Sequence, residues 1–231
     1  MKNDLKILTS NSSRTVLDSL APAFERASGR RCAVEFDSAK SMLARIETGA
    51  TGDIVILGNA VLAELERLGT VRPGSTRLFA RSRVGVAVRS GAARPDISTV
   101  DAFRRALLDA KSVAHTVHGA SGMYVPVLLE RLGIAVQVKP KTITRPGGYI
   151  GSVVASGEAE IAVQQIVELK AVPGIDIVGP LPHEIQQVIE TAAGIFSSFS
   201  QPDAAEELIR FLLSPIAAGV FREVGLEQAA S

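Results

Sequence analysis

Residues 5–13, Leu-Lys-Ile-Leu-Thr-Ser-Asn-Ser-Ser, join a short apolar run to a turn that is rich in hydroxyl groups. Apolar residues then recur at helical spacing at Val16, Leu17, Leu20 and Phe24. This order predicts a strand, a tight turn and an amphipathic helix. Such a turn lies at the carboxyl edge of a parallel sheet, where open α/β folds bind ligands. The free N–H groups and the positive end of the helix favour an anion there.

A second turn of the same kind occurs far along the chain. Gly119-Ala120-Ser121-Gly122 follows the strand-like Ser112-Val113-Ala114 and precedes a helical pattern over Met123–Leu132. Two hydroxyl-bearing turns at such junctions suggest that one anion is held between two lobes.

Strand-like runs alternate with helical patterns through most of the chain, which predicts parallel sheets wound by helices. Two long extended segments, near 84–88 and 185–195, would join two α/β units as a hinged pair. Pro22 is expected to kink or divide the first helix. Further strands are expected at 32–36, 53–57, 112–114, 136–139 and 160–163, and further helices near 42–46, 61–68, 100–108, 123–132, 150–156, 204–213 and 216–224.

Composition limits the function classes. The chain has 231 residues, 46% hydrophobic and 21% charged, with a net charge of +1 and no basic run, which argues against a nucleic-acid surface. No apolar stretch reaches transmembrane length, so no membrane insertion is expected. The N-terminus has no apolar signal region, so the protein is expected to be cytoplasmic as written, or periplasmic if a signal peptide was removed. Cys32 lies in an apolar stretch and is interpreted as a buried strand residue.

Several motifs in a fixed order carry a family resemblance over nearly the whole chain. They are Ser10–Ser13, Phe24–Gly29, Ile46–Val55, Gly119–Tyr124, Val154–Ile161 and Leu212–Ala218. With them the chain resembles the type 2 periplasmic-binding-protein superfamily, and within it the molybdate-binding-protein-like group. The resemblance implies a two-lobed α/β fold with mixed sheets, flanking helices and two crossover strands. It places lobe one at 1–82 plus 189–231 and lobe two at 83–188, with the ligand cleft between them.

The resemblance also implies positions for ligand contacts. The family's first binding serine matches Ser12, in the same turn as Ser10 and Asn11. The third segment matches Ser121 and the adjoining Gly122.

Other positions depart from the molybdate pattern. In the second segment Ser38 remains, but Ala39 stands in place of a contacting serine and Lys40 is new. The backbone contact of the fourth segment falls at Tyr149 or a direct neighbour, and Gln164 stands where molybdate binders have a capping tyrosine. Molybdate or another oxyanion is therefore the less favoured ligand.

The charged residues near these positions favour a carboxylate. Lys40, Arg145, Arg14 and His118 could converge with the hydroxyl groups, and arginine pairs bidentately with a planar carboxylate. An organic polycarboxylate is thus the expected ligand of a solute-binding-type protein, with an ABC transporter permease as partner if the protein is exported.

An enzyme is the alternative. Arg81–Arg89, Pro95–Thr99 and Gly157–Gln165 resemble a branch of the group that includes aconitate isomerase, which interconverts cis- and trans-aconitate without a cofactor. His118, Tyr124 or Lys40 would then supply the base. A detached LysR-type effector domain is disfavoured, since no helix-turn-helix precedes the first strand.

Ordinary structural roles stay open for several of these residues. Ser12, Ser13 and Ser121 could be plain helix caps. His118 could be a hydrogen-bonded loop residue, and Tyr124 could pack in the core. His115 and His183 lack metal-ligand spacing, and no nucleotide-binding glycine pattern occurs, so no metal and no cofactor are expected.

Overall fold

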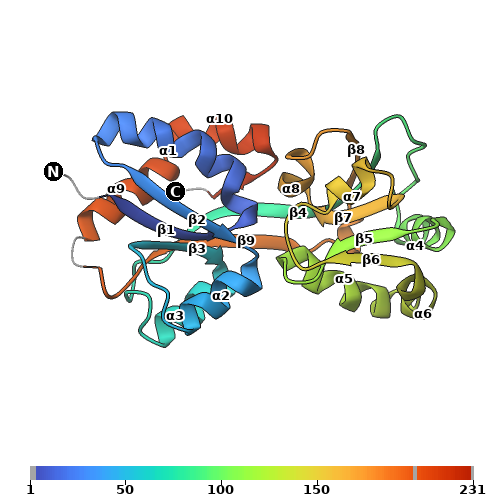
Figure 1. Cartoon of the computed structure of the whole chain (residues 1–231), viewed down its shortest axis with the longest axis horizontal. Coiled ribbons are helices and arrows are strands. Elements are labelled where there is room, and N and C mark those ends of the chain that lie inside the picture. The colour runs from blue at the N-terminus through green and yellow to red at the C-terminus, as the bar shows by residue number, and fades with distance from the viewer. Residues whose placement is uncertain (1–3, 200–201, 230–231) are drawn as a thin grey trace. The chain divides into compact units, whose positions relative to one another are not determined.

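A computed structural model describes residues 4–199 and 202–229. It divides into two compact units: unit 1, up to residue 81 and from residue 190, and unit 2, residues 82–189. Two strands belong to both units, β4 (Arg77–Arg89) and β9 (Val188–Ile195). Figure 1 shows the elements of each unit.

Unit 1 is built around a mixed sheet. Its strands β1 (Leu5–Ser10), β2 (Cys32–Asp37) and β3 (Ile54–Gly58) are parallel, and β9 pairs antiparallel with β3. The short β10 (Glu227–Gln228) pairs with the start of β4. The helices of this unit are α1 (Arg14–Ser28), α2 (Ala39–Glu47), α3 (Asn59–Arg67), α9 (Pro202–Leu212) and α10 (Pro215–Val224).

The unit 1 helices lie on two faces of the sheet, with α1 and α10 on one and α2 and α3 on the other (Figure 1). On the second face Met42 and Leu62 pack with Leu8 and Val55 in a buried cluster. The apolar residues that recur at helical spacing in α1 are buried, as the sequence predicts. Because α1, α2 and α3 follow the parallel strands β1, β2 and β3, each of these three helices begins near the carboxyl edge of the sheet.

Unit 2 repeats this arrangement with shorter elements. Parallel strands β5 (Val113–Thr116), β6 (Thr142–Arg145) and β7 (Ile161–Gln165) lie in the order β7-β5-β6. Beyond β7, β4 pairs antiparallel with both β7 and β8 (Ile175–Pro180). The helices are α4 (Val100–Asp109), α5 (Ala120–Arg131), α6 (Ala135–Val138), α7 (Gly151–Ala155) and α8 (Ile166–Lys170).

The unit 2 core shows the strand alternation directly. Val84, Val86 and Val88 face one buried cluster, which α4 and α5 cover, while Ala87 between them faces a second cluster that includes residues of α7 and α8. Both sheet faces are therefore buried, as the continuous apolar run of β4 predicts.

The structure corrects some of the expected elements. Residues 136–139 are not a strand: they fall in α6 and a following 3-10 turn, because Ile134 and Val138 are both buried at helical spacing while Val136 is 84% exposed. Pro22 does not divide α1, which continues from Arg14 to Ser28, and Pro22 is exposed. The strand expected at 185–195 begins only at Val188. Strands β6 and β8 were not expected from the sequence.

Candidate functional site

The first candidate site lies at the carboxyl edge of the unit 1 sheet. In the parallel register of β1 and β2, the last residues of the two strands, Ser10 and Asp37, are direct partners. The 3-10 turn Asn11–Ser13 and the start of α2 therefore leave the sheet side by side. We call residues 10–14 and 36–41 the unit 1 edge.

Hydroxyl groups of the unit 1 edge are buried and close together. Ser12 is 8% exposed, and its Oγ lies 3.0 Å from Ser10 Oγ. Ser38 caps α2, because its Oγ accepts from the Ser41 N–H at 3.3 Å. Ser13, at the N-cap of α1, makes no side-chain cap hydrogen bond. Capping therefore accounts for Ser38 and not for the hydroxyl of Ser13.

Two cationic side chains belong to the unit 1 edge. The Arg14 guanidinium stacks over the ring of Phe36 at 3.9 Å from the centroid, which fixes its position at the start of α1. Lys40 is exposed in the first turn of α2.

The corresponding edge of unit 2 gathers three loops. β5 ends at Thr116 opposite Arg145, the last residue of β6. Beyond the strands, the His118 N–H donates to Pro146 O at 2.9 Å, so the loops after β5 and β6 continue together. The third loop follows β7. We call residues 116–122, 145–150 and 164–168 the unit 2 edge.

Two buried hydroxyls at the start of α5 have no hydrogen-bond partner among the described residues. They are Ser121 Oγ and Thr116 Oγ1, on residues that are 0% and 1% exposed. The N-cap of α5 is Gly119, so Ser121 lies inside the first turn and is not the cap. Buried polar atoms are normally satisfied, so these two are positioned to meet a ligand or water.

Two glycines allow α5 to approach the end of β5 this closely. A Cβ at Gly122 would lie 2.0 Å from the carbonyl oxygen of Thr116, and one at Gly119 would lie 2.7 Å from Thr116 Oγ1. Any side chain would push the helix start away from Thr116. The predicted Gly-x-x-Gly turn is thus a steric requirement of the unit 2 edge.

Gln164 holds the loop that carries Tyr149. Its Oε1 accepts from the Ile150 N–H and its Nε2 donates to Gly148 O, both at 2.8 Å. Gln164 is 0% exposed. Its side chain therefore holds the backbone of residues 148–150.

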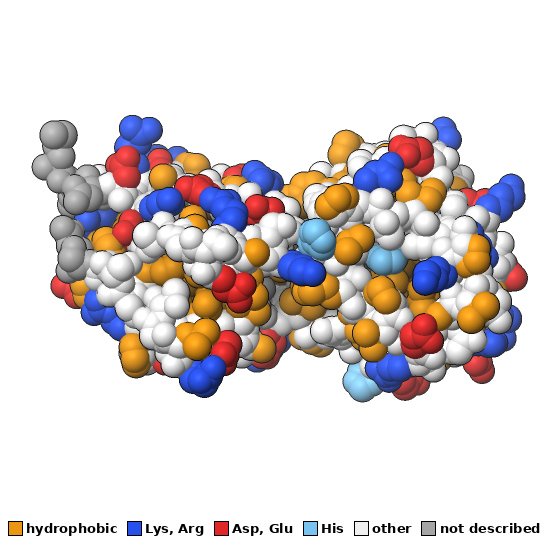
Figure 2. Space-filling view, turned by 60° about the horizontal axis from the view of Figure 1, so that its bottom comes forward, with side chains coloured by type: hydrophobic (Ala, Val, Ile, Leu, Met, Phe, Trp, Pro, Cys, Tyr) orange, Lys and Arg blue, Asp and Glu red, His pale blue; other side chains and the backbone are white. Residues whose placement is uncertain are grey.

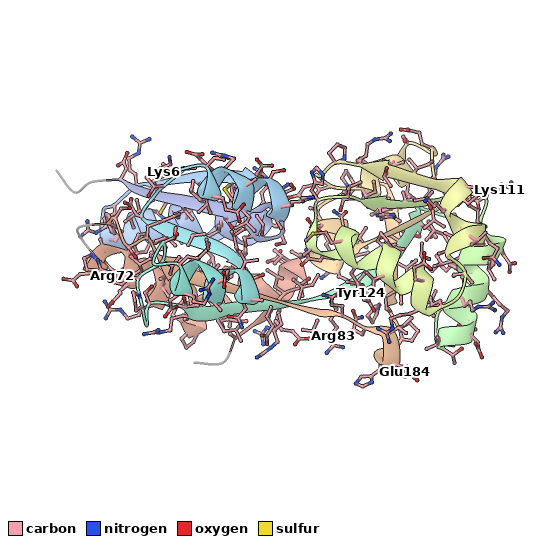
Figure 3. All side chains as sticks on the ribbon, turned by 90° about the horizontal axis from the view of Figure 1, so that it is seen from below. Lys6, Arg72, Arg83, Lys111, Tyr124 and Glu184 are labelled. Carbon is pink, nitrogen blue, oxygen red and sulfur yellow. The ribbon has the colours of Figure 1, made fainter. Side chains whose placement is uncertain are left out.

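Two other residues expected at the site, Tyr124 and Arg145, form contacts with other parts of unit 2. The Tyr124 hydroxyl donates to Ile185 O at 2.6 Å, and burial raises the pKa of this phenol. Figure 3 shows Tyr124 near the segment that carries Glu184. Arg145 is exposed and forms an ion pair with Glu158 at 2.8 Å. His118 is partly buried in the loop after β5.

Glu168 is a site residue that sequence reasoning missed. It is 5% exposed in α8, and Gln165 Nε2 donates to its Oε2 at 3.3 Å. Burial raises the pKa of its carboxyl to about 8, although hydrogen bonds from Gln165 and Gln164 oppose the rise. The only signal in the sequence is one acidic residue within the apolar run Ile166–Leu169.

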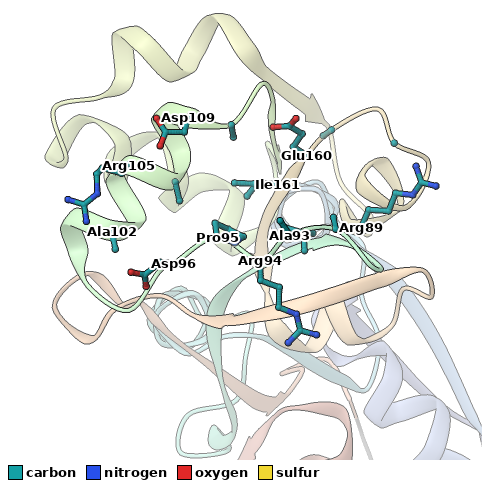
Figure 4. A pocket seen from close by; sticks show the side chains of 16 residues that line it. Arg89, Ala93, Arg94, Pro95, Asp96, Ala102, Arg105, Asp109, Glu160 and Ile161 are labelled. Carbon is teal, nitrogen blue, oxygen red and sulfur yellow. The ribbon is translucent and has the colours of Figure 1, made fainter.

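Other features of the structure do not add to these edges. A cavity of about 690 Å³ in unit 2 is lined by α4 and by residues 92–96, and the Arg94 and Arg105 guanidinium groups point away from its centre (Figure 4). Burial raises the pKa of the half-buried Cys32 thiol to about 12, which makes it a poor nucleophile. On the face shown in Figure 2, basic and acidic side chains are interspersed.

Residues 4–199 and 202–229 contain no group of three or more His, Cys, Asp or Glu side chains that could hold a metal ion. Within those residues, no helix combines the length and the apolar character that crossing a bilayer requires.

The fold and its two edges define a solute-binding protein. The chain belongs to the family of bacterial extracellular solute-binding proteins, whose model matches residues 5–227. It is 34% identical over 229 residues to the aconitate isomerase of a Pseudomonas species, an alignment that covers 96% of this chain and 87% of that protein. The family is extracellular, so this match lends no support to the cytoplasmic location expected from the N-terminus.

Solved structures show the same fold at low identity. The periplasmic molybdate-binding protein of Azotobacter vinelandii aligns with a TM-score of 0.80 at 20% identity, covering 96% of this chain and 98% of that one. The sulfate-binding protein of Mycobacterium tuberculosis aligns with a TM-score of 0.76 at 14% identity, covering 99% and 88%. The chain thus has the two-lobed type 2 periplasmic-binding-protein fold in its molybdate-binding-like form, which confirms the resemblance and the α/β fold class.

Glu168 predicts an unusual dependence of stability on pH. Its pKa is about 8 in the folded protein and near 4.5 in an unfolded chain, so the unfolded state loses its proton first as pH rises. The free energy of unfolding should therefore fall by up to about 1.4 kcal/mol per pH unit between these values and level off above them. Glu168→Gln should remove this slope in denaturant melts from pH 5 to 9. The exposed control Glu184→Gln should keep it, and parallel curves for wild type and Glu168→Gln would contradict the assignment.

Proposed function

We propose that the protein binds a small organic polycarboxylate through the polar groups of its sheet edges. The observation that carries the proposal is the pair of buried hydroxyls, Ser121 Oγ and Thr116 Oγ1, without partners at the start of α5. An anion there would accept from both hydroxyls and lie at the positive end of a helix of 12 residues. If the protein acts in transport, its partner is an ABC permease.

The charges favour a carboxylate over a tetrahedral oxyanion. Arg14 and Lys40 bring two cationic side chains to the unit 1 edge, where the one carboxylate, Asp37, is already within 3.8 Å of Arg45. The side chain at the position of the capping tyrosine, Gln164, is occupied with Gly148 and Ile150. The relative at 34% identity is named for aconitate, which is a tricarboxylate. Molybdate or another oxyanion is the less favoured ligand.

Replacing Ser121 separates ligand binding from stability. Because Ser121 Oγ has no protein partner, Ser121→Ala should leave the thermal midpoint of the ligand-free protein unchanged or slightly raised. It should weaken trans-aconitate binding about tenfold or more, since a hydrogen bond to a charged group is worth roughly 1.5–3 kcal/mol. Calorimetric titration measures the affinity, and Ser19→Ala on α1 is the control. Unchanged affinity in Ser121→Ala would remove the central contact of the proposal.

Replacing Lys40 tests the class of ligand. If Lys40 meets one carboxylate of several, Lys40→Ala should weaken citrate and aconitate by a larger factor than acetate or another monocarboxylate. Thermal shifts over a panel with molybdate and sulfate give the comparison, because a ligand at a hundredfold excess over Kd stabilises by about 2.7 kcal/mol. Lys111→Ala, 89% exposed in unit 2, is the control. Equal losses for mono- and polycarboxylates, or stabilisation by molybdate alone, would contradict the polycarboxylate proposal.

A second candidate function is isomerisation of the bound ligand, favoured by the 34% identity to aconitate isomerase over nearly the whole chain. A base would take a proton from the methylene carbon, the electron pair would spread over the adjoining double bond and carboxylate, and the proton would return at the other allylic carbon. His118 and Lys40 are the better bases. Tyr124 already donates its proton to Ile185 O, and burial raises its pKa.

The isomerase candidate predicts conversion of cis- into trans-aconitate without added cofactor. His118→Asn should lower kcat by about 10²–10⁴-fold if the imidazole moves the proton. His183→Asn, on an exposed turn, should match the wild type. Chromatographic separation of the two isomers measures the conversion. Tight aconitate binding with no conversion above the buffer rate would exclude the enzyme and leave the binding protein.

A further inference from the structure

A carboxyl group is buried at the unit 2 edge within hydrogen-bonding reach of two amides. Glu168 lies between the buried Val167 and Leu169 in α8. Its carboxyl interacts with the side-chain amides of Gln164 and Gln165, the last two residues of β7. Burial of an ionised carboxylate is costly, and the raised pKa of about 8 keeps the group neutral at pH 7.

The charged groups of the elements around α8 are placed as follows. β7 carries no titratable side chain. Asp176 of β8 interacts with Arg94, Ser90 and the Gly91 N–H. The unit 2 part of β4 carries Arg83 and Arg89, and α8 itself ends with Lys170. The causes that act on the Glu168 pKa are burial and the two glutamine amides.

Gln164 connects Glu168 to the binding loop. Its Nε2 donates to Gly148 O, its Oε1 accepts from the Ile150 N–H, and its side chain also lowers the pKa of the Glu168 carboxyl through a hydrogen bond. A primary amide has these three contacts available at once. The conformation of residues 148–150, where Gly148 has a φ of +82°, thus depends on an amide that Glu168 helps to hold.

We propose that Glu168 is a positioning residue of the unit 2 edge, which sets the backbone of residues 148–150 for an anionic ligand by fixing the Gln164 side chain. This inference rests on the proposed function. It differs from a direct contact, since the carboxyl is buried beneath the edge and acts through the amide.

The second amide donates to Glu168 as it stands, and it would give the carboxyl proton an acceptor if its oxygen and nitrogen were exchanged. Gln165 Oε1 is buried and has no partner among the described residues. Exchanging the oxygen and nitrogen of this amide places an acceptor at the Glu168 carboxyl. The protonated acid can then donate to Gln165 and accept from Gln164. A glutamine at 168 keeps a carbonyl acceptor and provides N–H donors in place of the O–H, and a leucine keeps only the approximate volume.

The test compares Glu168→Gln and Glu168→Leu in the full-length protein at pH 7. Two measurements are made: calorimetric affinity for trans-aconitate, and amide hydrogen exchange of Ile150 in the ligand-free protein. Glu168→Leu should speed Ile150 exchange and weaken trans-aconitate binding at least tenfold, while its thermal midpoint shows it fully folded. Glu168→Gln should stay within twofold of wild type in both, as should the control Glu184→Gln.

Each outcome decides the role of Glu168. A folded Glu168→Leu variant with unchanged Ile150 exchange, or with faster exchange and unchanged affinity, overturns the proposal. A Glu168→Gln variant that loses affinity as Glu168→Leu does also overturns it, because the amide should replace the acid. If Glu168→Leu does not fold, Glu168→Met replaces it under the same criteria. If the wild type binds none of the anions, the proposed function fails, and Ile150 exchange alone then decides whether Glu168 holds the loop.

Discussion

Parallel pairing in register is the constraint on which both candidate edges depend. In unit 1 it brings the ends of β1 and β2 together at Ser10 and Asp37, and in unit 2 the ends of β5 and β6 at Thr116 and Arg145. The loops and helix starts that follow must emerge at one edge. Slipping either strand by one residue would turn alternate side chains to the opposite sheet face, so the buried clusters that specify the register also specify the polar edges.

Close approach then limits which residues can form the unit 2 edge. α5 lies so near the end of β5 that Gly122 has no room for a Cβ, and the same contact encloses Thr116 and Ser121. A polar atom buried in this way is costly unless it is satisfied. Unpaired hydroxyls beneath a helix start therefore give up some stability, which a bound anion can restore.

The sequence predicted the edges better than the details behind them. The periodicities of strands and helices are local properties of the sequence. The turns at Ser10–Ser13 and Gly119–Gly122 can therefore be predicted from the sequence alone. The apolar pattern at 136–139 predicts a strand, whereas the structure has α6 and a 3-10 turn there. Four residues are too few to distinguish the period of a strand from that of a helix. The role of Glu168 depends on burial by β7 and α8, and the engagement of Arg145 with Glu158 depends on side-chain geometry. Neither can be inferred from spacing alone.

Gln164 is the departure from the molybdate pattern that also affects the loop at 148–150. Where related binders place a tyrosine that caps the anion, this chain has an amide whose hydrogen bonds run to the loop at 148–150. The amide that stands in place of the cap makes this loop depend on the carboxyl of Glu168. Burial raises the pKa of that carboxyl, whereas the hydrogen bonds from the two glutamine amides favour its ionised form. Burial is the larger effect, so the loop is supported by a buried acid that is neutral at pH 7.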